Sequence, residues 1–170
     1  MDRGKGSGLC TEIHRLRLQS LAVLISSCLL GIGCRYDGSH SGVEEIIKKA
    51  QEMGLVPICP EQLGGLPTPR APSSIVKGDG TGVLAGRAQV MNSLGEDVTG
   101  AFMKGARETL KLARITGAKK AILKDKSPSC GLNTPYCETD TGYGLGVTAA
   151  LLLSAGIEVV EIDPEGKIRI

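Results

Sequence analysis

Three of the six cysteines in this 170-residue chain stand shortly after short apolar runs. Cys28 and Cys59 follow such runs closely, and Cys130 lies in the loop after a third one. Apolar runs of this length, bounded by glycine and proline, are typical of buried strands in a parallel sheet. The loops that leave the carboxyl ends of such strands share one edge, where ligands bind. We therefore expect three thiolates to converge there and to hold a metal or an iron–sulfur cluster with one open coordination position.

Acidic and hydroxyl side chains lie beside two of these cysteines. Glu61 follows Cys59 on a turn that Pro60 makes rigid, so its carboxylate should point to the same edge. There it could act as a general base, although a surface glutamate on a proline-rich loop is the plain alternative. Ser127 and Ser129 precede the third cysteine and could contact a substrate, or they could simply cap a turn.

Other polar and glycine residues near the expected site have two interpretations each. Arg35 and Asp37 lie in the loop after the first apolar run and could contact substrate, or Asp37 could make a turn with the next glycine. The run Gly142-x-Gly144-x-Gly146 opens a predicted helix and could bind an anion there. It lacks the full G-x-G-x-x-G spacing of a dinucleotide site, which favours a packing role.

The remaining cysteines carry weaker signals. Cys34 and Cys137 lie away from strand ends, which favours free thiols over ligands, and Cys10 lies near the N-terminus. The sequence has no C-x-x-C pair, so the usual zinc-knuckle and thioredoxin spacings are absent. A chain of this length does not need disulfides for stability, so the cysteines fit a reducing, cytoplasmic location.

Alternating patterns define the elements that must position these residues. Short apolar runs predict strands, and apolar residues at helical spacing predict helices. Residues 59–82 and 125–143 show no periodicity and predict two long loops. We expect strands at 21–26, 55–58, 120–124 and 157–162, helices at 43–53, 98–116 and 146–154, and an edge strand or hairpin arm at 87–92.

This order predicts an α/β fold: a single-domain, three-layer, Rossmann-like parallel sheet of about four core strands, with the site at the C-terminal edge. The chain is 41% hydrophobic and long enough to fill such a core. Its net charge of +2, the absence of Trp and the single Phe give no case for binding nucleic acid or an anionic membrane. A small molecule is therefore the expected partner, and nothing in the sequence predicts the oligomeric state.

The N-terminal region supports two interpretations. Residues 1–17 are polar and basic and 18–33 are largely apolar, which resembles an export signal with a lipoprotein-like box before Cys28. We favour the alternative, in which residues 1–20 are a disordered extension or a mis-assigned start and 21–170 form one domain. The apolar run is too short to span a bilayer, and without it the sheet would lack its first strand.

Five motifs, in a fixed order over about residues 21–162, carry a specific resemblance. They read Ser-Ser-Cys-Leu-Leu-Gly at 26–31, Cys-Arg-Tyr-Asp-Gly at 34–38, Val-Pro-Ile-Cys-Pro-Glu-Gln-Leu-Gly-Gly-Leu-Pro-Thr-Pro-Arg at 56–70, Ala-Ile-Leu-Lys-Asp-Lys-Ser-Pro-Ser-Cys-Gly at 121–131 and Gly-Val-Thr-Ala-Ala at 146–150. This set resembles the bacterial family catalogued as domain of unknown function 523, which includes the thiouracil desulfidases. Residues 1–20 depart from the family pattern, since its members usually begin just before the first strand.

The resemblance implies a [4Fe-4S] cluster held by the three strand-end cysteines, with one iron left open for the thiocarbonyl sulfur of a thiolated pyrimidine such as 2-thiouracil. It also implies that water activated by Glu61 attacks the carbon and that sulfur leaves as hydrosulfide, with no redox change of the substrate. Ser127 would hydrogen-bond the pyrimidine or orient the water, with Ser129 the less favoured candidate. Arg35 and Asp37 are further candidates for substrate binding.

The residues by themselves are also compatible with two functions of other classes. One is a three-cysteine zinc site, either catalytic or purely structural. The other is a redox- or metal-sensing module in which a cluster only reports on oxygen or iron. Iron and zinc both accept thiolates, so the sequence does not identify the metal. The presence of Glu61 and Ser127 beside the cysteines favours catalysis over sensing.

Overall fold

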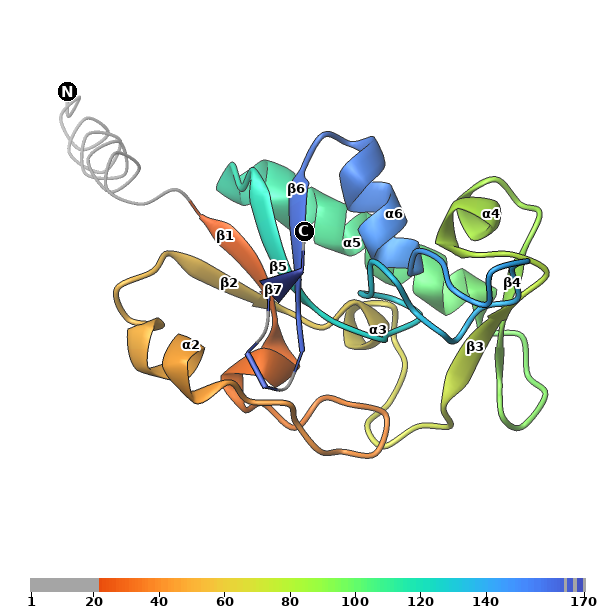
Figure 1. Ribbon diagram of the computed structural model, residues 1–170, viewed down its shortest axis with the longest axis horizontal. Helices are drawn as coiled ribbons and strands as arrows, with labels where there is room; N and C mark the ends of the chain where they lie inside the picture. The colour runs from red at the N-terminus through yellow and green to blue at the C-terminus, as the bar shows by residue number, and fades with distance from the viewer. Residues whose placement is uncertain (1–21, 164, 167, 170) are drawn as a thin grey trace, which may run out of the picture.

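The computed structural model describes residues 22–163, 165–166 and 168–169. These residues form a five-stranded sheet in the order β2-β1-β5-β6-β7 and a separate two-stranded hairpin (Figure 1). The interpretation of residues 1–20 as an extension lies outside the described residues. The sheet strands are β1 (Val23–Ser26), β2 (Leu55–Ile58), β5 (Lys120–Lys124), β6 (Glu158–Ile162) and β7 (Ile168–Arg169).

Four strands of the sheet run parallel, which confirms the predicted α/β architecture. The chain passes from β1 to β2 on one side and returns to β5 on the other side of β1. This reversal between β1 and β5 is the topological switch point, and ligands of open α/β sheets bind outside its carboxyl ends. The sequence patterns do not indicate β7, which pairs antiparallel with β6 over only two residues.

Helices cover both faces of the sheet, and successive strand residues face opposite sides. Leu24 and Leu123 point to the face covered by α5 and α6, where they pack with Leu152. Ile25 lies in a second core on the face of η1 and α2, together with Leu29. The helical segments are η1 (Ser27–Leu30), α2 (Glu44–Lys49), α3 (Pro60–Leu63), α4 (Gly80–Leu84), α5 (Thr99–Thr116) and α6 (Val147–Ser154).

The prediction of one long loop over 59–82 is wrong. That segment contains α3, β3 (Ser73–Val76) and the start of α4, and each of these elements is only four or five residues long. Elements this short leave no periodicity in a window of 11–18 residues, which is the signal that sequence patterns provide. Local chemistry defines them instead. Pro60 occupies the first turn of α3, and the Asp79 carboxylate caps α4 by accepting two backbone N–H bonds.

The hairpin forms a second packing unit beside the sheet. β3 pairs antiparallel with β4 (Gln89–Asn92), which confirms the hairpin arm expected at 87–92. Its inner side chains, including Ile75 and Val90, pack with Phe102 of α5 in a separate core. In Figure 1 this hairpin lies at the end of the molecule away from α2.

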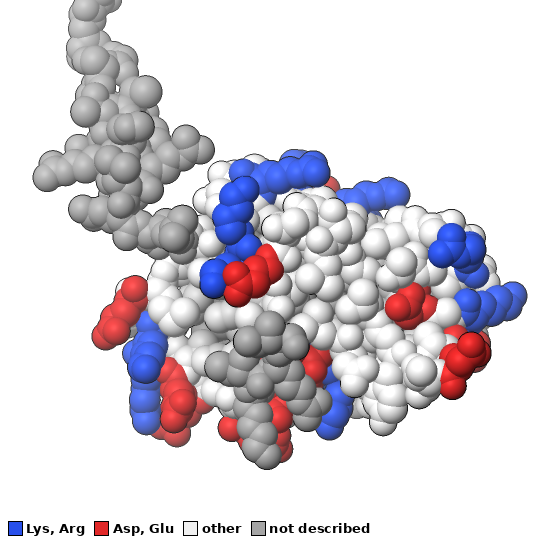
Figure 2. Space-filling view, turned by 45° about the horizontal axis from the view of Figure 1, so that its top comes forward, with Lys and Arg blue, Asp and Glu red and all other residues white. Residues whose placement is uncertain are grey.

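The other predicted helices are present, although α2 ends at Lys49 and the chain continues as turns to Gly54. No helix in the described part of the chain is both long and apolar enough to cross a membrane. Figure 2 shows side chains of both charges scattered over one face, with broad uncharged areas between them.

Candidate metal centre and active site

A cavity of about 750 Å³ opens at the carboxyl edge of the parallel strands. The loops after β1, β2 and β5 line one side of it, and the β3–β4 hairpin lines the other. The predicted location of the site, at this edge of the sheet, therefore coincides with a cavity large enough for a small-molecule ligand.

The three predicted thiols lie around this one cavity. Cys28 is in η1 directly after β1, Cys59 is the N-cap residue of α3 after β2, and Cys130 lies in the loop after β5. All three are free cysteines. The structure thus brings together residues that are about a hundred positions apart in sequence, and their role as ligands stays a prediction.

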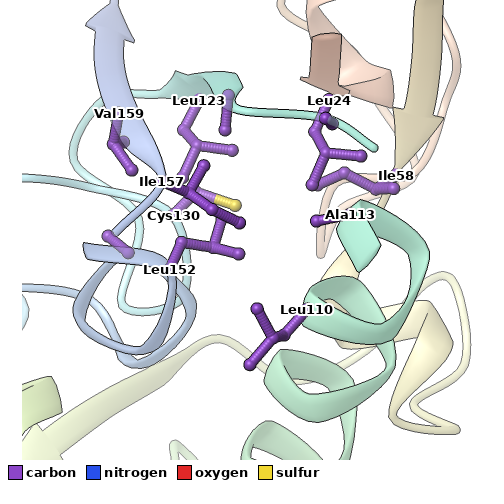
Figure 3. Packing of buried hydrophobic residues seen from close by; sticks show 12 residues of the cluster. Leu24, Ile58, Leu110, Ala113, Leu123, Cys130, Leu152, Ile157 and Val159 are labelled. Carbon is purple, nitrogen blue, oxygen red and sulfur yellow. The ribbon is translucent and has the colours of Figure 1, made fainter. Parts of the chain in front are cut away.

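Cys130 is the most deeply embedded of the three. Figure 3 shows it among the apolar side chains of Leu123, Leu152 and Ile157. Burial raises the pKa of its thiol to about 12, while a hydrogen bond that the Ser26 hydroxyl donates to its sulfur, 3.6 Å away, partly opposes this. In the absence of a bound cation this thiol is therefore protonated at neutral pH.

A fourth thiol, Cys34, also lines the cavity. Sequence reasoning treats it as a free thiol away from the strand ends, and the structure does leave it free, but buried at the site. Contact with the Cys28 thiol, followed by burial, raises the pKa of Cys34 to about 11, and contact with Cys59 opposes that rise. The Cys34 thiol in turn raises the pKa of Cys59, whose sulfur donates to the Cys34 carbonyl oxygen at 3.7 Å.

Glu61 lies on the first turn of α3 and lines the same cavity. Its Oε2 accepts a hydrogen bond from Arg70 Nε at 2.6 Å, and both side chains are largely buried. Among the described residues, Oε1 has no hydrogen-bond partner. One carboxylate oxygen is therefore fixed in place while the other is available to a ligand or a water molecule.

Arg70 connects Glu61 to the loop that carries Cys34. Its Nη2 donates to the Cys34 carbonyl oxygen at 3.1 Å, and its Nη1 donates to Pro67 O and Thr68 Oγ1. Sequence reasoning did not single out Arg70. No sequence pattern marks it, because its position beside Glu61 depends on the path of the proline-rich turn between them.

α3 can carry Glu61 to this position because Gly105 has no side chain. A Cβ atom at Gly105, in the middle of α5, would lie 1.9 Å from the carbonyl oxygen of Pro60. Real atoms cannot approach so closely, so any side chain here would push α3 away. The contact between α3 and α5 thus sets the place of the candidate base.

Ser127 lines the cavity and also organises the loop of Cys130. Its Oγ accepts hydrogen bonds from the backbone N–H groups of Ser129 at 3.2 Å and Cys130 at 3.1 Å. These two bonds occupy both lone pairs of the hydroxyl. Within the described residues its proton has no acceptor, so the O–H group can donate into the cavity. The turn-forming and ligand-binding interpretations of Ser127 are therefore compatible.

Ser129 has a different position. It is 1% exposed, its hydroxyl shares a 2.9 Å hydrogen bond with Thr148 of α6, and it does not line the cavity. The Ser129 carbonyl oxygen accepts from Thr148 N at 2.8 Å. Gly146 permits this packing, since a Cβ there would lie 2.5 Å from that same oxygen. The packing role expected for the glycine run is confirmed at Gly146.

Arg35 lines the cavity, whereas Asp37 does not. The Asp37 carboxylate accepts from Ser39 N at 3.0 Å and Ser39 Oγ at 2.6 Å, and these bonds lower its pKa. This is the turn-forming alternative for Asp37. Arg35 donates to Ser41 Oγ at 3.1 Å.

A buried ion pair at the cavity was not expected from the sequence. Lys124 lines the cavity, and its Nζ lies 2.8 Å from Asp125 Oδ1. Asp125 is 1% exposed, and its Oδ2 has no hydrogen-bond partner within the described part of the chain. The two residues are adjacent at the end of β5, but a single charged pair in sequence carries no distinctive signal.

Comparison with known proteins agrees with this geometry. The family model of 2-thiouracil desulfurase matches residues 23–163. The protein YbbK of Bacillus subtilis (strain 168) is 49% identical over 141 residues, which cover 81% of this chain and 93% of YbbK. Among solved structures, the [4Fe-4S]-dependent thiouracil desulfidase TudS superposes with a TM-score of 0.69 at 34% identity. The match covers 82% of this chain and 89% of TudS.

Proposed function

The chain belongs to the 2-thiouracil desulfurase family, and from that premise we propose that it is an iron–sulfur-dependent desulfidase. In this proposal it removes sulfur as hydrosulfide from a thiolated pyrimidine such as 2-thiouracil. The single observation that carries the proposal is the meeting of Cys28, Cys59, Cys130, Glu61 and Ser127 around one cavity. Ligands, a base and a hydrogen-bond donor are then within reach of one substrate.

The donor set supports a cluster of several irons. Thiolates are the usual protein ligands of [4Fe-4S] clusters, and three of them leave one iron without a protein ligand. Among the described residues, no three His, Cys, Asp or Glu side chains are grouped closely enough to hold a single metal ion. Three thiolates on a zinc ion would have to lie about 2.3 Å from one common point. The similarity to the [4Fe-4S]-dependent desulfidase TudS favours the cluster over zinc.

Loading the site requires protons to leave. Burial and neighbouring thiols hold the pKa values of Cys59 and Cys130 above their ordinary range, so these ligands must lose protons as iron binds. When bound, the cluster supplies a Lewis acid that polarises a thiocarbonyl group. The remaining chemistry falls to residues of this chain.

Glu61 is the proposed general base. Arg70 holds Oε2, and the free Oε1 takes a proton from a water molecule that attacks the thiocarbonyl carbon. The carbon–sulfur bond breaks, and the sulfur leaves with its electron pair as hydrosulfide. The balance is one thiocarbonyl group and one water molecule giving one carbonyl group and one hydrogen sulfide, with no change of oxidation state.

Ser127 is the proposed hydrogen-bond donor to the pyrimidine or to the attacking water. Its lone pairs are taken by the backbone of the Cys130 loop, which leaves only its proton for the ligand. This orientation is fixed before substrate arrives, and pre-orientation lowers the entropy cost of the reaction. Ser129 and Asp37 have no such access, and we now assign them to structural support.

The test is an anaerobic reconstitution followed by a sulfide-release assay with 2-thiouracil. We compare the wild type with Glu61→Gln, which keeps an oxygen to accept from Arg70 but removes the base. Loss of a general base typically costs about 10²–10⁴-fold in rate. We expect that loss in Glu61→Gln, with iron content and the visible absorption band unchanged.

Glu108→Gln on α5 is the matched control and should keep full activity, because Glu108 is partly exposed and does not line the cavity. A colourless, zinc-loaded wild type would refute the cluster. An iron-loaded wild type that releases no sulfide from any thiolated pyrimidine would refute the desulfidase and favour the sensing module. Full activity of Glu61→Gln would remove Glu61 from the mechanism.

A further inference from the structure

Aromatic side chains are scarce in this chain, yet two of them lie at the cavity. The whole sequence contains three Tyr, one Phe and no Trp. Phe102 is 1% exposed in the hairpin core, and Tyr143 is outside the cavity wall. Tyr36 and Tyr136 both line the cavity and are 42% and 49% exposed. Large aromatic side chains that stay exposed inside a concave site are typical of ligand contacts.

Both tyrosines are held in place through their backbones by one short segment, residues 70–75, which includes most of β3. Arg70 N donates to the Tyr36 carbonyl oxygen at 2.7 Å, and Ile75 N donates to the Tyr136 carbonyl oxygen at 2.9 Å. Tyr136 N also donates to Thr134 Oγ1 at 3.2 Å. Two loops about a hundred residues apart are therefore fixed to the same segment, and each brings a tyrosine to the cavity wall.

The ring of Tyr36 already has one partner. The Arg35 guanidinium lies 5.9 Å from the ring centroid, within the range of a cation–π contact. Arg35 is itself held by Ser41, whose hydroxyl accepts from it at 3.1 Å. A ring that is covered on one face by a fixed cation keeps its orientation and leaves its other face for a ligand. Arg35 then acts on the substrate through Tyr36.

We propose that Tyr36 and Tyr136 are specificity-determining residues, whose rings stack on the flat heterocycle of the substrate. The site would then select aromatic cyclic thiocarbonyl compounds over saturated rings and acyclic thioureas that carry the same reacting group. The inference rests on the proposed desulfidase function, because stacking matters only if a thiolated ring enters this cavity. Under this proposal the two tyrosine rings recognise the heterocycle of the substrate rather than its C=S group.

The size of the effect follows from stacking on nucleobases in other proteins. Removing an aromatic side chain that stacks on a base weakens binding by about 5- to 150-fold. The same side chain contributes little to a puckered ring, which cannot lie flat against it. The tyrosines should therefore affect the KM for flat substrates much more than kcat or the KM for saturated ones.

The experiment uses the iron-loaded protein and two probes, 2-thiouracil and 5,6-dihydro-2-thiouracil, which differ in the ring double bond. Kinetics are measured for wild type, Tyr36→Ala, Tyr136→Ala and the matched control Tyr143→Ala, with Tyr36→Phe and Tyr136→Phe to restore the ring. Calorimetric titration with uracil and with dihydrouracil measures binding without turnover. Iron content and circular dichroism verify that each variant folds and is loaded.

We expect Tyr36→Ala and Tyr136→Ala to raise the KM for 2-thiouracil and the dissociation constant for uracil by at least about 5-fold each. The KM for the dihydro probe should change less than about twofold, and both Phe variants and Tyr143→Ala should resemble wild type. Equal losses for the flat and the saturated probe, or no loss for either, would overturn the stacking role. A wild type that turns over neither probe but still binds uracil in a tyrosine-dependent way would overturn the desulfidase and keep the stacking site.

Discussion

The carboxyl edge of the parallel sheet and the β3–β4 hairpin face the same cavity but differ in what they bring to it. The loops after β1, β2 and β5 supply all of its thiols and its acidic group. The hairpin side supplies only neutral residues, which are Pro72, Ser73, Ser74, Val76, Met91, Asn92 and Ser93. The thiols and the acidic group therefore come from the sheet edge, whereas the hairpin contributes only an uncharged wall of the cavity.

The physical basis of this division is topology. Parallel strands end at one edge, so residues from distant segments meet there without any long excursion of the chain. The hairpin instead has its own core, with Ile75, Val90 and Phe102 at its centre. It can change its outer side chains without disturbing the sheet. The catalytic residues and the hairpin wall of the cavity can then vary independently.

The strongest test of the division replaces one cysteine from each region. Cys59→Ser, at the sheet edge, should abolish cluster binding, because a serine hydroxyl is a much poorer iron ligand than a thiolate. Cys137→Ser is the control, since Cys137 is also a free cysteine but is buried in the hairpin core. Iron and acid-labile sulfide are measured after anaerobic reconstitution.

We expect no cluster in Cys59→Ser and a wild-type amount in Cys137→Ser. Cys28→Ser and Cys130→Ser should behave like Cys59→Ser, whereas Cys34→Ser should retain the cluster. Full iron content in Cys59→Ser would end the three-ligand assignment. Loss of iron in Cys34→Ser alone would transfer one ligand position to Cys34.

The next test moves the candidate base without changing it. Gly105→Ala places a Cβ atom against the Pro60 carbonyl oxygen, so α3 and Glu61 must shift. A misplacement of about 1 Å can cost about 10²-fold in rate, and overpacking costs about 1–3 kcal/mol of stability. Gly100→Ala lies in the same helix with nothing within 4 Å of the added atom.

Sulfide release and thermal unfolding are measured for both glycine variants. Gly105→Ala should be the slow, less stable enzyme, with iron still bound. Gly100→Ala should match wild type or gain slightly in stability, since Ala restricts the unfolded chain. Equal rates for the two variants would mean that the position of α3 does not govern the reaction.

A smaller effect is expected at Ser127, which both holds the Cys130 loop in place and is the proposed hydrogen-bond donor to the substrate. Ser127→Ala leaves the Ser129 and Cys130 amides without their acceptor and removes the donor to the substrate. One hydrogen bond is worth about 0.5–1.5 kcal/mol, so turnover should fall by up to about 10-fold, with a partial loss of iron. Ser127→Thr keeps the hydroxyl and should recover both. Unchanged iron loading in Ser127→Ala would show that the loop does not need this acceptor.

The difference between the sheet and the hairpin also explains which elements could be predicted from the sequence. Strands β1, β2, β5 and β6 could be predicted because they coincide with apolar runs. Burial on both faces makes a parallel strand continuously hydrophobic. Convergence of Cys28, Cys59 and Cys130 followed from that order alone. Most of the hairpin region was interpreted as a loop, since its elements are defined by capping and tight turns rather than by periodicity.

Contacts between side chains were harder to predict than elements. The position of Arg70 beside Glu61 depends on the path of the turn at 64–70, which no pattern specifies. Ser129 and Asp37 carried the right chemistry near the right residues, but backbone geometry directs them to Thr148 and Ser39. Proximity in sequence to a cysteine therefore did not decide which polar side chain reaches the cavity.

The smallest effect is expected on the hairpin side of the cavity. Met91 lies on β4, lines the cavity and is partly buried, so Met91→Ala removes apolar contact area without touching a charged group. Each buried methylene is worth about 0.8 kcal/mol, and partial contact predicts an increase in KM of about 2- to 5-fold. The turnover number and the iron content should stay at wild-type values, because both depend on the sheet edge. Leu94→Ala is the control, since Leu94 is 73% exposed and outside this cavity. A steep fall in kcat, or loss of iron, in Met91→Ala would mean that the hairpin takes part in catalysis or cluster binding. These roles would then not be confined to the sheet edge.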